Sequence, residues 1–374
     1  MEFIDLKAQY QVLSKDITEA VQHVLADANY IMGPEVERFE REIAERAQVK
    51  HCISCANGTD ALVIALMAKD IGPGDAVFVP SFTFMSTAEC ASNVGATPVM
   101  CDINLRTYNL DPDSLEQAII RVKEEGKLRP AAVIGVDLFG QCADYPAIEA
   151  ICEKHGLYLV EDAAQGYGGT IRGQAACSFG DVAITSFFPA KPLGCYGDGG
   201  ALFTDDDELA EIFRSIRVHG RGEHKYDNVR VGMNSRLDTL QAAILRIKLQ
   251  AFHDYEMDRR QEIAAYYDAN LRDRFETPFV PSGYVSSWAQ YTLLMDDEET
   301  RDRIQQSLKE QGVPSMVYYA KPLHLQTVYA DLGYKEGDLP NSEAASRQVL
   351  QIPMHPYLSA EDAERVVNAL RNAF

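Results

Sequence analysis

The sequence predicts an α/β protein with a doubly wound, mostly parallel sheet, followed by a smaller C-terminal α+β domain. From residue 50 to 205, short apolar runs alternate with amphipathic stretches of helical period. Short apolar runs flanked by helices are typical of parallel strands that are covered on both faces. A stretch without Gly or Pro then predicts a long helix, and the chain length of 374 residues suits a large domain with an appended smaller one.

Two helices are expected before the sheet, and strands then alternate with helices along the large domain. The first helix covers residues 9–25, and the second begins at Pro34, because proline fits the first turn of a helix. The expected strands are 51–56, 76–80, 97–102, 131–136, 157–162, 182–187 and 200–204. The expected helices between them are 58–70, 111–125 and 144–156.

The C-terminal part is expected to form the smaller domain. We place an N-terminal arm and the large domain in residues 1–250 and the small domain in residues 251–374. The long helix covers residues 237–271. Further strands are expected at 290–295 and 313–319, and further helices at 299–312, 342–351 and 359–374.

The chain is acidic, because 35 Lys and Arg residues against 56 Asp and Glu residues give a formal net charge of −21. Such a protein repels a phosphate backbone, which argues against nucleic-acid binding, and an anionic substrate would require a local cluster of cations. The N-terminus lacks the apolar run of a secretory signal, and no stretch approaches the ~18 consecutive apolar residues of a membrane span. We therefore expect a cytoplasmic protein without a membrane segment.

Eight cysteines are present, and Cys52 and Cys55 have the C-x-x-C spacing of redox and metal sites. A lone pair supplies only half of a four-ligand zinc site, and both residues fall inside an expected strand. We favour burial as apolar strand residues, with a redox or metal role as the alternative. No metal site is predicted.

Lys191 is the only charged residue between positions 182 and 197, and it lies in SFFPAKPLGCYGDGG (186–200). Pro192, which follows it, keeps its backbone out of the α region. A lysine in apolar surroundings has a lowered pKa and can act as a nucleophile or a base. The alternative is a surface lysine whose stem covers apolar residues at the mouth of a loop.

Three further signals lie where predicted strands end. Asp162 is the last residue of the run LYLVED, and ligands of open α/β sheets bind beyond the carboxyl ends of strands. The alternative role of Asp162 is that of a helix cap or a turn residue. Gly58 and Thr59 begin a helix after a strand, where the free N–H groups of the first turn can bind an anion. The alternative is an ordinary Asn or Thr helix cap that binds no anion. Phe84 follows another strand, where its aromatic ring could cover a planar ligand. The alternative is an ordinary aromatic residue of the core.

Taken together, these signals describe one ligand. Ser186 adds a hydroxyl, so the set combines an anion cradle, an aromatic cover, a carboxylate and an amine. Pyridoxal phosphate (PLP) requires all four, since its aldehyde bonds to a lysine and its ring nitrogen pairs with an acid. Neither a P-loop nor a G-x-G-x-x-G after a strand is present, which argues against nucleoside triphosphates and dinucleotides.

An ordered series of motifs over nearly the whole chain resembles the DegT/DnrJ/EryC1/StrS family of PLP-dependent nucleotide-sugar aminotransferases. The series is FIDLKAQY, YIMGPEVERFE, NGTDAL, PSFTFMSTAE, VEDAAQ, SFFPAKPLGCYGDGGALFT, VGMNSRLDTLQAAIL and PMHPYL. The resemblance implies the fold type I architecture of PLP-dependent transferases, which aspartate aminotransferase shares. CISCANGTDAL, TYNLDP and GQCADY look closest to enzymes that aminate C3 of a UDP-linked 2-acetamido-2-deoxy-hexuluronic acid for bacterial surface polysaccharide such as O-antigen.

The resemblance assigns roles to residues that match the family's motifs. Lys191 would carry PLP as a Schiff base and act as the catalytic base and acid, and Asp162 would pair with the ring nitrogen. Gln165 would contact the ring hydroxyl, and Phe84 would stack on the ring. The residues that would hold the phosphate are Gly58, Thr59, Ser186 and, from the partner subunit of a homodimer, Asn234. The residues that would meet the sugar are Tyr30, Arg236, Tyr318 and Tyr319, with Arg236 reaching the sugar carboxylate across the dimer interface.

Two departures from the family pattern concern the sugar rather than the cofactor. Where the family often has V-H-Y-P and P-V-H-L-Y-G, this chain has Tyr318 and Asp137 in the histidine positions. Arg236 is common in the wider family, and pairing with Asp238 at a helix start is its structural alternative. Amination of a 3-keto- or 4-keto-6-deoxy dTDP- or GDP-hexose therefore remains the alternative function.

The expected reaction takes the amino group from L-glutamate and places it on the keto sugar. The related sugar dehydratases have His where this chain has Lys191, so the lysine favours transamination. The alternative from another class is a non-catalytic regulatory protein with the PLP-enzyme fold. The intact set of Lys191, Asp162 and Ser186 argues against that alternative, and the negative charge argues against its DNA-binding form.

Overall fold

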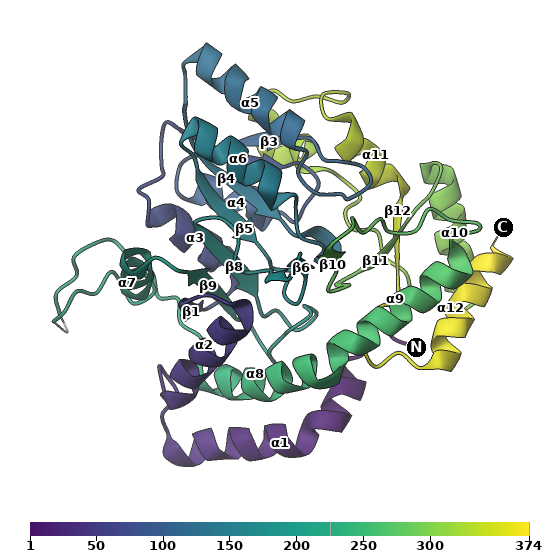
Figure 1. Cartoon of the computed structure of the whole chain (residues 1–374), viewed down its shortest axis with the longest axis horizontal. Coiled ribbons are helices and arrows are strands. Elements are labelled where there is room, and N and C mark those ends of the chain that lie inside the picture. The colour runs from purple at the N-terminus through teal and green to yellow at the C-terminus, as the bar shows by residue number, and fades with distance from the viewer. Residues whose placement is uncertain (225, 374) are drawn as a thin grey trace.

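The computed structural model describes residues 1–224 and 226–373, and a seven-stranded sheet lies at its centre (Figure 1). The strands are β1 (His51–Cys55), β2 (Asp75–Pro80), β3 (Thr97–Cys101), β4 (Arg129–Val136), β5 (Tyr158–Asp162), β8 (Val182–Ser186) and β9 (Gly200–Thr204). Their order across the sheet is β1-β9-β8-β5-β4-β2-β3, and in this described sheet β9 runs in the direction opposite to the other six strands. The predicted α/β class with a mostly parallel sheet is confirmed.

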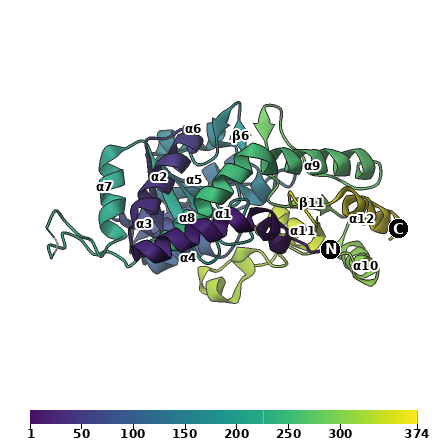
Figure 2. The same cartoon turned by 90° about the horizontal axis from the view of Figure 1, so that it is seen from below.

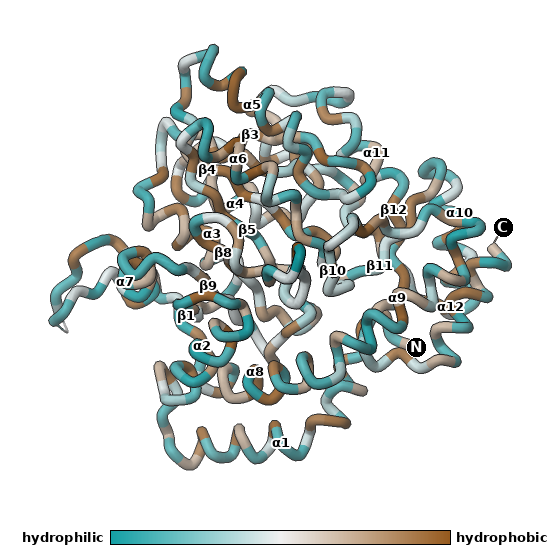
Figure 3. Tube along the Cα trace, in the orientation of Figure 1, coloured by the Kyte–Doolittle hydropathy of each residue, from teal (hydrophilic) through white to brown (hydrophobic). Residues whose placement is uncertain are grey.

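Helices cover both faces of the sheet, as a doubly wound fold requires (Figures 1 and 2). One face packs against α2 (Pro34–Ala47), α5 (Pro112–Glu125), α6 (Tyr145–His155) and α8 (Thr239–Ala251). The other face packs against α3 (Gly58–Met67), α4 (Ser86–Asn93) and α7 (Asp207–Ile216). Successive strand residues point to opposite faces, so Cys52 belongs to the first core and Ile53 to the second. Figure 3 shows the result as brown strands inside helices that carry much teal.

The N-terminal helix α1 (Leu6–Asp27) lies along α8 and forms one edge of the molecule (Figures 1 and 2). Asp5 caps it, because its Oδ1 atom accepts a hydrogen bond of 2.8 Å from the Ala8 N–H. Leu13 of α1 belongs to the same small apolar cluster as Ile244 of α8. In the described ranges, the helices are all too short or too polar to cross a membrane.

The helix predicted over 237–271 is present from Thr239 onward, with one irregular turn. α8 continues through a π-helical turn (Phe252–Glu256) into α9 (Met257–Leu271). α9, α10 (Glu298–Glu310) and α12 (Ala360–Asn372) pack around a separate core with β11 (Tyr291–Leu294) and β12 (Val349–Ile352). The expected domain boundary at residue 250 falls beside the irregular turn, and the division into two domains stays a prediction. Phe374, the last residue of the predicted C-terminal helix, lies outside the described residues.

The remaining elements are short. The small three-stranded sheet contains β6 (Thr170–Ile171), β7 (Gln174–Ala175) and β10 (Tyr284–Val285). The 3-10 helices are η1 (Leu138–Gly140), η3 (Leu323–Leu325) and η4 (Thr327–Leu332), and the helix α11 (Pro340–Gln348) follows them.

The structure corrects two predictions in the C-terminal part. Residues 313–319, expected as a strand, form only an isolated bridge from Met316 to Gln351 in the described structure. The helix expected over 342–351 ends at Gln348, and the next four residues form β12. This run, VLQI, is fully buried beside β11, and its β-branched ends favour extended backbone over a longer helix.

Four parallel strands end at one edge of the sheet and position the functional site. β2, β4, β5 and β8 end at Pro80, Val136, Asp162 and Ser186. Because these strands run in the same direction, the loops that follow them meet beyond that edge, close to the first turns of α3 and α4. The site residues come from these loops and helix starts.

Candidate active site

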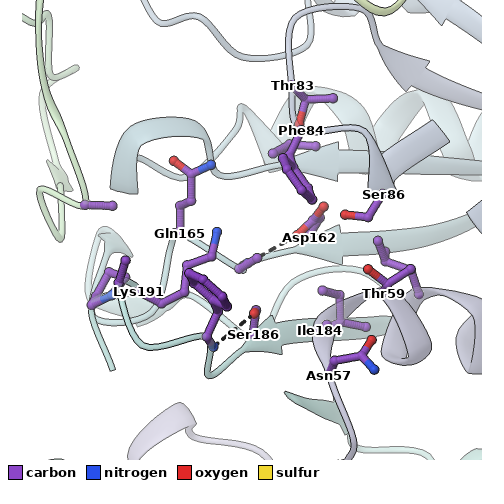
Figure 4. Close-up of a pocket in the computed structure, with 18 of the residues that line it drawn as sticks. Asn57, Thr59, Thr83, Phe84, Ser86, Asp162, Gln165, Ile184, Ser186 and Lys191 are labelled. Atoms are coloured by element: carbon purple, nitrogen blue, oxygen red, sulfur yellow. Dashed lines mark hydrogen bonds between the residues drawn. The ribbon is translucent and has the colours of Figure 1, made fainter. Parts of the chain in front are cut away.

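A cavity of ≈ 490 Å³ opens at this edge and gathers most of the predicted site residues (Figure 4). Those that line it are Gly58, Thr59, Phe84, Asp162, Gln165, Ser186, Lys191, Tyr318 and Tyr319. Tyr30, Asn234 and Arg236 are not among its lining residues. One chain thus brings together most of the residues expected at the cofactor and leaves outside three that were expected to contact phosphate or sugar.

Lys191 lies in a tight loop between β8 and β9 and contributes to the cavity wall. Its N–H donates a hydrogen bond of 2.9 Å to the Phe188 carbonyl oxygen, which closes a turn. A Cβ atom at Gly194 would lie 2.5 Å from the Pro189 carbonyl oxygen, so the loop folds back where only glycine fits. Desolvation lowers the pKa of the Lys191 amine, while the Asp162 carboxylate acts in the opposite direction. The amine is therefore closer to the neutral form that a nucleophile or base requires.

Asp162 is the last residue of β5 and is buried beside the cavity. Its Oδ1 atom accepts a hydrogen bond of 3.2 Å from the Ala164 N–H, and its Oδ2 atom accepts one of 3.0 Å from the Thr87 hydroxyl. Burial raises the pKa of this carboxyl, whereas the two hydrogen bonds and the charge of Lys191 lower it. A buried carboxyl of this kind can share a proton with a ring nitrogen in the cavity.

The first turn of α3 faces Ser186, at the place where the sequence predicts an anion cradle. Asn57 caps the helix, because its Oδ1 atom accepts a hydrogen bond of 2.8 Å from the Asp60 N–H. The N–H groups of Gly58 and Thr59 have no intrahelical partners and point out of the helix start. A Cβ atom at Gly58 would lie 2.8 Å from the Ser186 Cβ, so glycine permits the two segments to approach. The Asn57 cap and the predicted anion site thus occur at the same turn.

Phe84, Tyr319 and Gln165 form another part of the cavity wall (Figure 4 shows Phe84 and Gln165). The Phe84 and Tyr319 ring centroids are 6.3 Å apart, and 54% of Phe84 is exposed. The Gln165 Nε2 atom donates a hydrogen bond of 3.3 Å to the Tyr319 hydroxyl, and its Oε1 atom accepts one of 3.0 Å from the Phe139 N–H. These bonds orient the Gln165 amide, and the open Phe84 ring is available to a planar ligand.

Asn234 and Arg236 lie in the segment between α7 and α8, part of which projects from the body of the molecule (Figures 1 and 2). An Arg236 guanidinium N–H donates a hydrogen bond of 2.6 Å to Asn234 Oδ1, and in the described chain the guanidinium forms no ion pair with Asp238. The Tyr30 carbonyl oxygen accepts a hydrogen bond of 2.9 Å from the Thr239 N–H, which brings Tyr30 close to the same segment. The alternative of an Arg236–Asp238 pair is therefore not supported.

Asp137, in one of the two positions where the family often has His, is fully buried. Its Oδ1 atom accepts a hydrogen bond of 2.8 Å from the Tyr145 hydroxyl, whereas Oδ2 has no partner in the described structure other than the carboxyl of Glu161. The Glu161 oxygens accept hydrogen bonds of 2.8 Å from the Cys177 and Phe179 N–H groups. Burial, reinforced by the like charge of the other carboxyl, raises the pKa of Glu161, and burial raises that of Asp137. Protonation is therefore favoured at this buried pair of carboxyls.

Cys52 and Cys55 are buried in β1 and are not joined by a disulfide, so the expected burial is confirmed. Burial raises the pKa of both thiols, that of Cys55 to about 12. Such thiols stay protonated and are poor nucleophiles and metal ligands. The described residues contain no cluster of three or more His, Cys, Asp or Glu side chains that could hold a metal ion.

Some cavity residues were not predicted from the sequence. They are Ile4, Asn57, Leu62, Thr83, Ser86, Val136, Ala164, Ile184, Phe188, Ala190, Pro192, Asp198, Ala289 and Gln290, and Thr87 lies behind Asp162. Thr87 belongs to the motif PSFTFMSTAE, so the motif could have drawn attention to it. Its hydrogen bond joins the start of α4 to the end of β5, and a contact between segments 75 positions apart is visible only in the fold.

The donor set fits PLP when tested against the structure itself. The cavity combines one amine of lowered pKa, a buried carboxyl, an exposed aromatic ring and a helix N-terminus beside a serine hydroxyl. These correspond to the aldehyde, the ring nitrogen, the ring face and the phosphate of the cofactor.

A model of the DegT/DnrJ/EryC1/StrS aminotransferase family matches residues 11–371. The chain belongs to this family. The resemblance drawn from the sequence is thereby confirmed, together with the aminotransferase class, the fold type and the PLP cofactor of the family.

The relatives cover the chain from end to end. The UDP-2-acetamido-2-deoxy-3-oxo-D-glucuronate aminotransferase of Pseudomonas aeruginosa is 48% identical over 100% of both chains. The crystal structure of an aminotransferase of the family from Brucella abortus has a TM-score of 0.96 at 49% identity and covers 100% of this chain and 99% of its own. NtdA from Bacillus subtilis, solved with bound cofactor PMP, has a TM-score of 0.88 at 30% identity and covers 99% of this chain and 83% of its own.

Proposed function

We propose that this aminotransferase moves the amino group of L-glutamate to C3 of a UDP-linked 2-acetamido-2-deoxy-hexuluronic acid. The observation that carries the cofactor chemistry is the position of Lys191 and Asp162 in one cavity beside an anion cradle. The sugar is supported by the Pseudomonas aeruginosa relative, which acts on a 3-oxo-glucuronate derivative linked to UDP. The proposed setting is the cytoplasmic synthesis of bacterial surface polysaccharide such as O-antigen.

In this reaction PLP supplies an electron sink, which stabilises negative charge at the carbon that exchanges its amino group. Lys191 anchors the cofactor and, once released, moves a proton as base and then as acid. Asp162 keeps a proton on the ring nitrogen, and Thr87 and the Ala164 N–H hold that carboxyl in place. Gly58, Thr59 and Ser186 bind the phosphate, while Phe84 covers one face of the ring.

The charges around the cavity support a homodimer with shared sites. Among the described lining residues, Lys191 is the only lysine or arginine, and Asp162 and Asp198 are negative. The cofactor phosphate, the nucleotide diphosphate and the sugar carboxylate together require more cations. Arg236 and Asn234 are joined by a hydrogen bond outside their own chain's cavity, and we propose that they complete the cavity of the partner subunit.

The uronate and the alternative sugars differ in one group that Arg236 can recognise. A planar guanidinium binds a carboxylate in bidentate fashion, and the 6-deoxy dTDP- or GDP-hexoses lack that carboxylate. Tyr318, which lines the cavity in place of a family histidine, offers a neutral hydroxyl to either sugar class. The geometry of Tyr318 therefore does not discriminate, and the uronate assignment depends on Arg236 and on the relatives.

The test is a panel of UDP-, dTDP- and GDP-linked keto sugars, each assayed with L-glutamate for the formation of 2-oxoglutarate. We expect the purified protein to absorb in the visible range and to lose that band when glutamate is added. We expect turnover of the UDP-hexuluronate. A protein that neither absorbs nor gains absorbance with added PLP would contradict the cofactor assignment, and turnover of 6-deoxy sugars alone would replace the uronate by the alternative function.

A further inference from the structure

Three polar side chains form a buried chain of hydrogen bonds next to the loop that carries Phe84. The Ser81 Oγ atom lies 2.7 Å from His324 Nδ1, and His324 Nε2 lies 3.2 Å from Glu343 Oε1. All three side chains are almost fully buried, and none of them lines the cavity. They join the end of β2 to η3 and α11, two elements that lie far from β2 in the sequence.

The hydrogen bonds assign one tautomer to His324. Its own backbone N–H donates to Ser81 Oγ (3.2 Å), so the Ser81 hydroxyl hydrogen is available for Nδ1. The remaining ring hydrogen is then on Nε2 and points to Glu343 Oε1, which also accepts a hydrogen bond of 2.8 Å from the Gly337 N–H. Every polar hydrogen in the chain of bonds has an acceptor, which makes the arrangement rigid.

A Ser–His–Glu series is also the catalytic triad of some hydrolases, but the surroundings of Ser81 do not permit nucleophilic catalysis. Ser81 has no exposed surface, so a substrate carbonyl cannot reach its oxygen. The oxygen is also occupied by the His324 backbone N–H. A serine nucleophile requires access by the substrate, which the buried Ser81 hydroxyl does not offer.

The Ser81 backbone is held as firmly as its side chain. Its N–H donates a hydrogen bond of 2.8 Å to the Cys101 carbonyl oxygen, and its carbonyl oxygen accepts one of 2.7 Å from the Leu323 N–H. The far end of the same loop is held where the Thr87 N–H donates to the Phe84 carbonyl oxygen at 3.3 Å. The loop from 81 to 85 therefore has anchors at both ends.

Glu343 has a firm position of its own. It lies in the first turn of α11, and the neighbouring Ser342 binds Asp102 at the end of β3 through its backbone N–H (2.8 Å) and its hydroxyl (2.7 Å). Asn341 N–H donates to the other Asp102 oxygen at 3.0 Å. α11 is thus fixed to the edge of the large sheet, and Glu343 can hold His324 at a set distance.

Phe84 depends on these anchors because its own side chain has few neighbours. More than half of its surface is exposed, at 54%, and its ring is tilted by 46° against Tyr319. A ring with so little packing is placed mainly by its backbone. The backbone of the loop in turn depends on Ser81, which precedes Phe84 by three residues.

We infer that Ser81, His324 and Glu343 are positioning residues that hold the Phe84 ring over the cofactor through the 81–85 loop. The inference rests on the proposed position of the cofactor beside Phe84. It predicts that breaking the chain of bonds weakens PLP binding and changes the geometry of the bound ring without removing any group that touches the ring.

The experiment compares Ser81→Ala, His324→Leu and Glu343→Gln with His355→Leu as the matched control. His355 is also buried, and it belongs neither to the Ser81–His324–Glu343 chain nor to the cavity lining, so leucine there removes no bond of that chain. PLP is titrated into each apoprotein to obtain Kd, and visible circular dichroism is recorded at saturating PLP. Far-ultraviolet circular dichroism and the thermal midpoint of the apoprotein report on folding.

We expect Ser81→Ala and His324→Leu to raise the Kd for PLP about tenfold and to reduce the visible circular dichroism per bound cofactor. Glu343→Gln keeps an oxygen that accepts from His324 and should stay close to wild type, as should PLP binding by His355→Leu. If His324→Leu does not fold, Ser81→Ala alone tests the inference, because this variant removes a single hydroxyl. Folded variants with wild-type Kd and dichroism would overturn the inference, whereas a wild-type protein that binds no PLP would overturn the proposed function instead.

Discussion

The Thr87 hydroxyl donates a hydrogen bond of 3.0 Å to the Oδ2 atom of Asp162, and so joins the start of α4 to the carboxyl end of β5. This bond lowers the pKa of a carboxyl that burial raises. It therefore supports the ionised form that pairs with a protonated ring nitrogen. Thr87 does not line the cavity, and it acts through Asp162.

Thr87→Val tests that relationship. Valine has nearly the shape of threonine but cannot donate, so the pKa of Asp162 should rise further and kcat should fall by about tenfold, for a lost bond to a buried charged group. Thr87→Ser keeps the hydroxyl and should retain most of the activity. The measurement is kcat against pH for both variants, and equal profiles for Thr87→Val and wild type would contradict the role of the bond.

Lys191→Ala removes the amine on which the proposed chemistry depends. Turnover should fall by about 10⁴-fold, because the variant loses both the covalent anchor and the proton carrier. PLP should still bind through the phosphate cradle and Asp162, but sodium borohydride should no longer attach it to the protein, as shown by mass spectrometry. Lys191→Arg keeps the charge and should be as inactive as the alanine variant. Substantial activity in either variant would contradict the assignment.

Arg236→Ala tests recognition of the sugar across the dimer interface. KM for the UDP-hexuluronate should rise by about ten- to a hundredfold, since a charged hydrogen-bonded pair is lost, while the half-reaction with glutamate alone continues. Mixing Arg236→Ala with Lys191→Ala subunits provides the stronger measurement. If Arg236 serves the partner's cavity, half of the randomly mixed dimers regain one intact site, and about one quarter of wild-type activity returns. No recovery would place Arg236 in the site of its own chain.

Asp137→Asn tests whether the buried carboxyls of Asp137 and Glu161 share a proton. Both carboxyls have pKa values raised in the folded protein. Their contribution to the free energy of unfolding is therefore fully present below the unfolded pKa of about 4, and it is lost as the pH rises through the raised folded values. Asparagine keeps an oxygen for the Tyr145 hydroxyl and places an N–H₂ group where Oδ2 has no other partner.

We expect Asp137→Asn to increase the free energy of unfolding by about 1–2 kcal/mol at pH 8 and to change it little at pH 4. Urea unfolding at the two pH values measures this difference. As a control, Asp181→Asn alters a carboxylate that accepts a hydrogen bond of 2.8 Å from the Leu159 N–H. An Asp137→Asn variant less stable than wild type at pH 8 would contradict the shared proton.

Much of the fold follows from local pattern. The apolar runs of the sheet are short and lie between amphipathic helices, so their strand character and double cover could be predicted. The errors lie where a short apolar run follows a helix directly. VLQI after α11 has no separating Gly or Pro, and its pairing with β11 depends on contacts with residues almost sixty positions away.

The candidate site shows the same division. Lys191, Asp162 and the turn at Gly58 were predicted because each marks a strand end or an unusual loop. Thr87, Gln290 and the Ser81–His324–Glu343 chain were not, since none differs locally from an ordinary core or loop residue.

The sequence by itself determined the α/β class, the family and the residues that fit PLP, because strand ends, glycine turns and ordered motifs are local features of the chain. Only the tertiary structure decided that Asp162 accepts a hydrogen bond from α4, that burial raises the pKa values of Asp137 and Glu161, and that the Phe84 loop is anchored from η3 and α11. These are contacts between segments distant in sequence. Their hydrogen bonds and raised pKa values arise from burial, which exists only after the chain has folded.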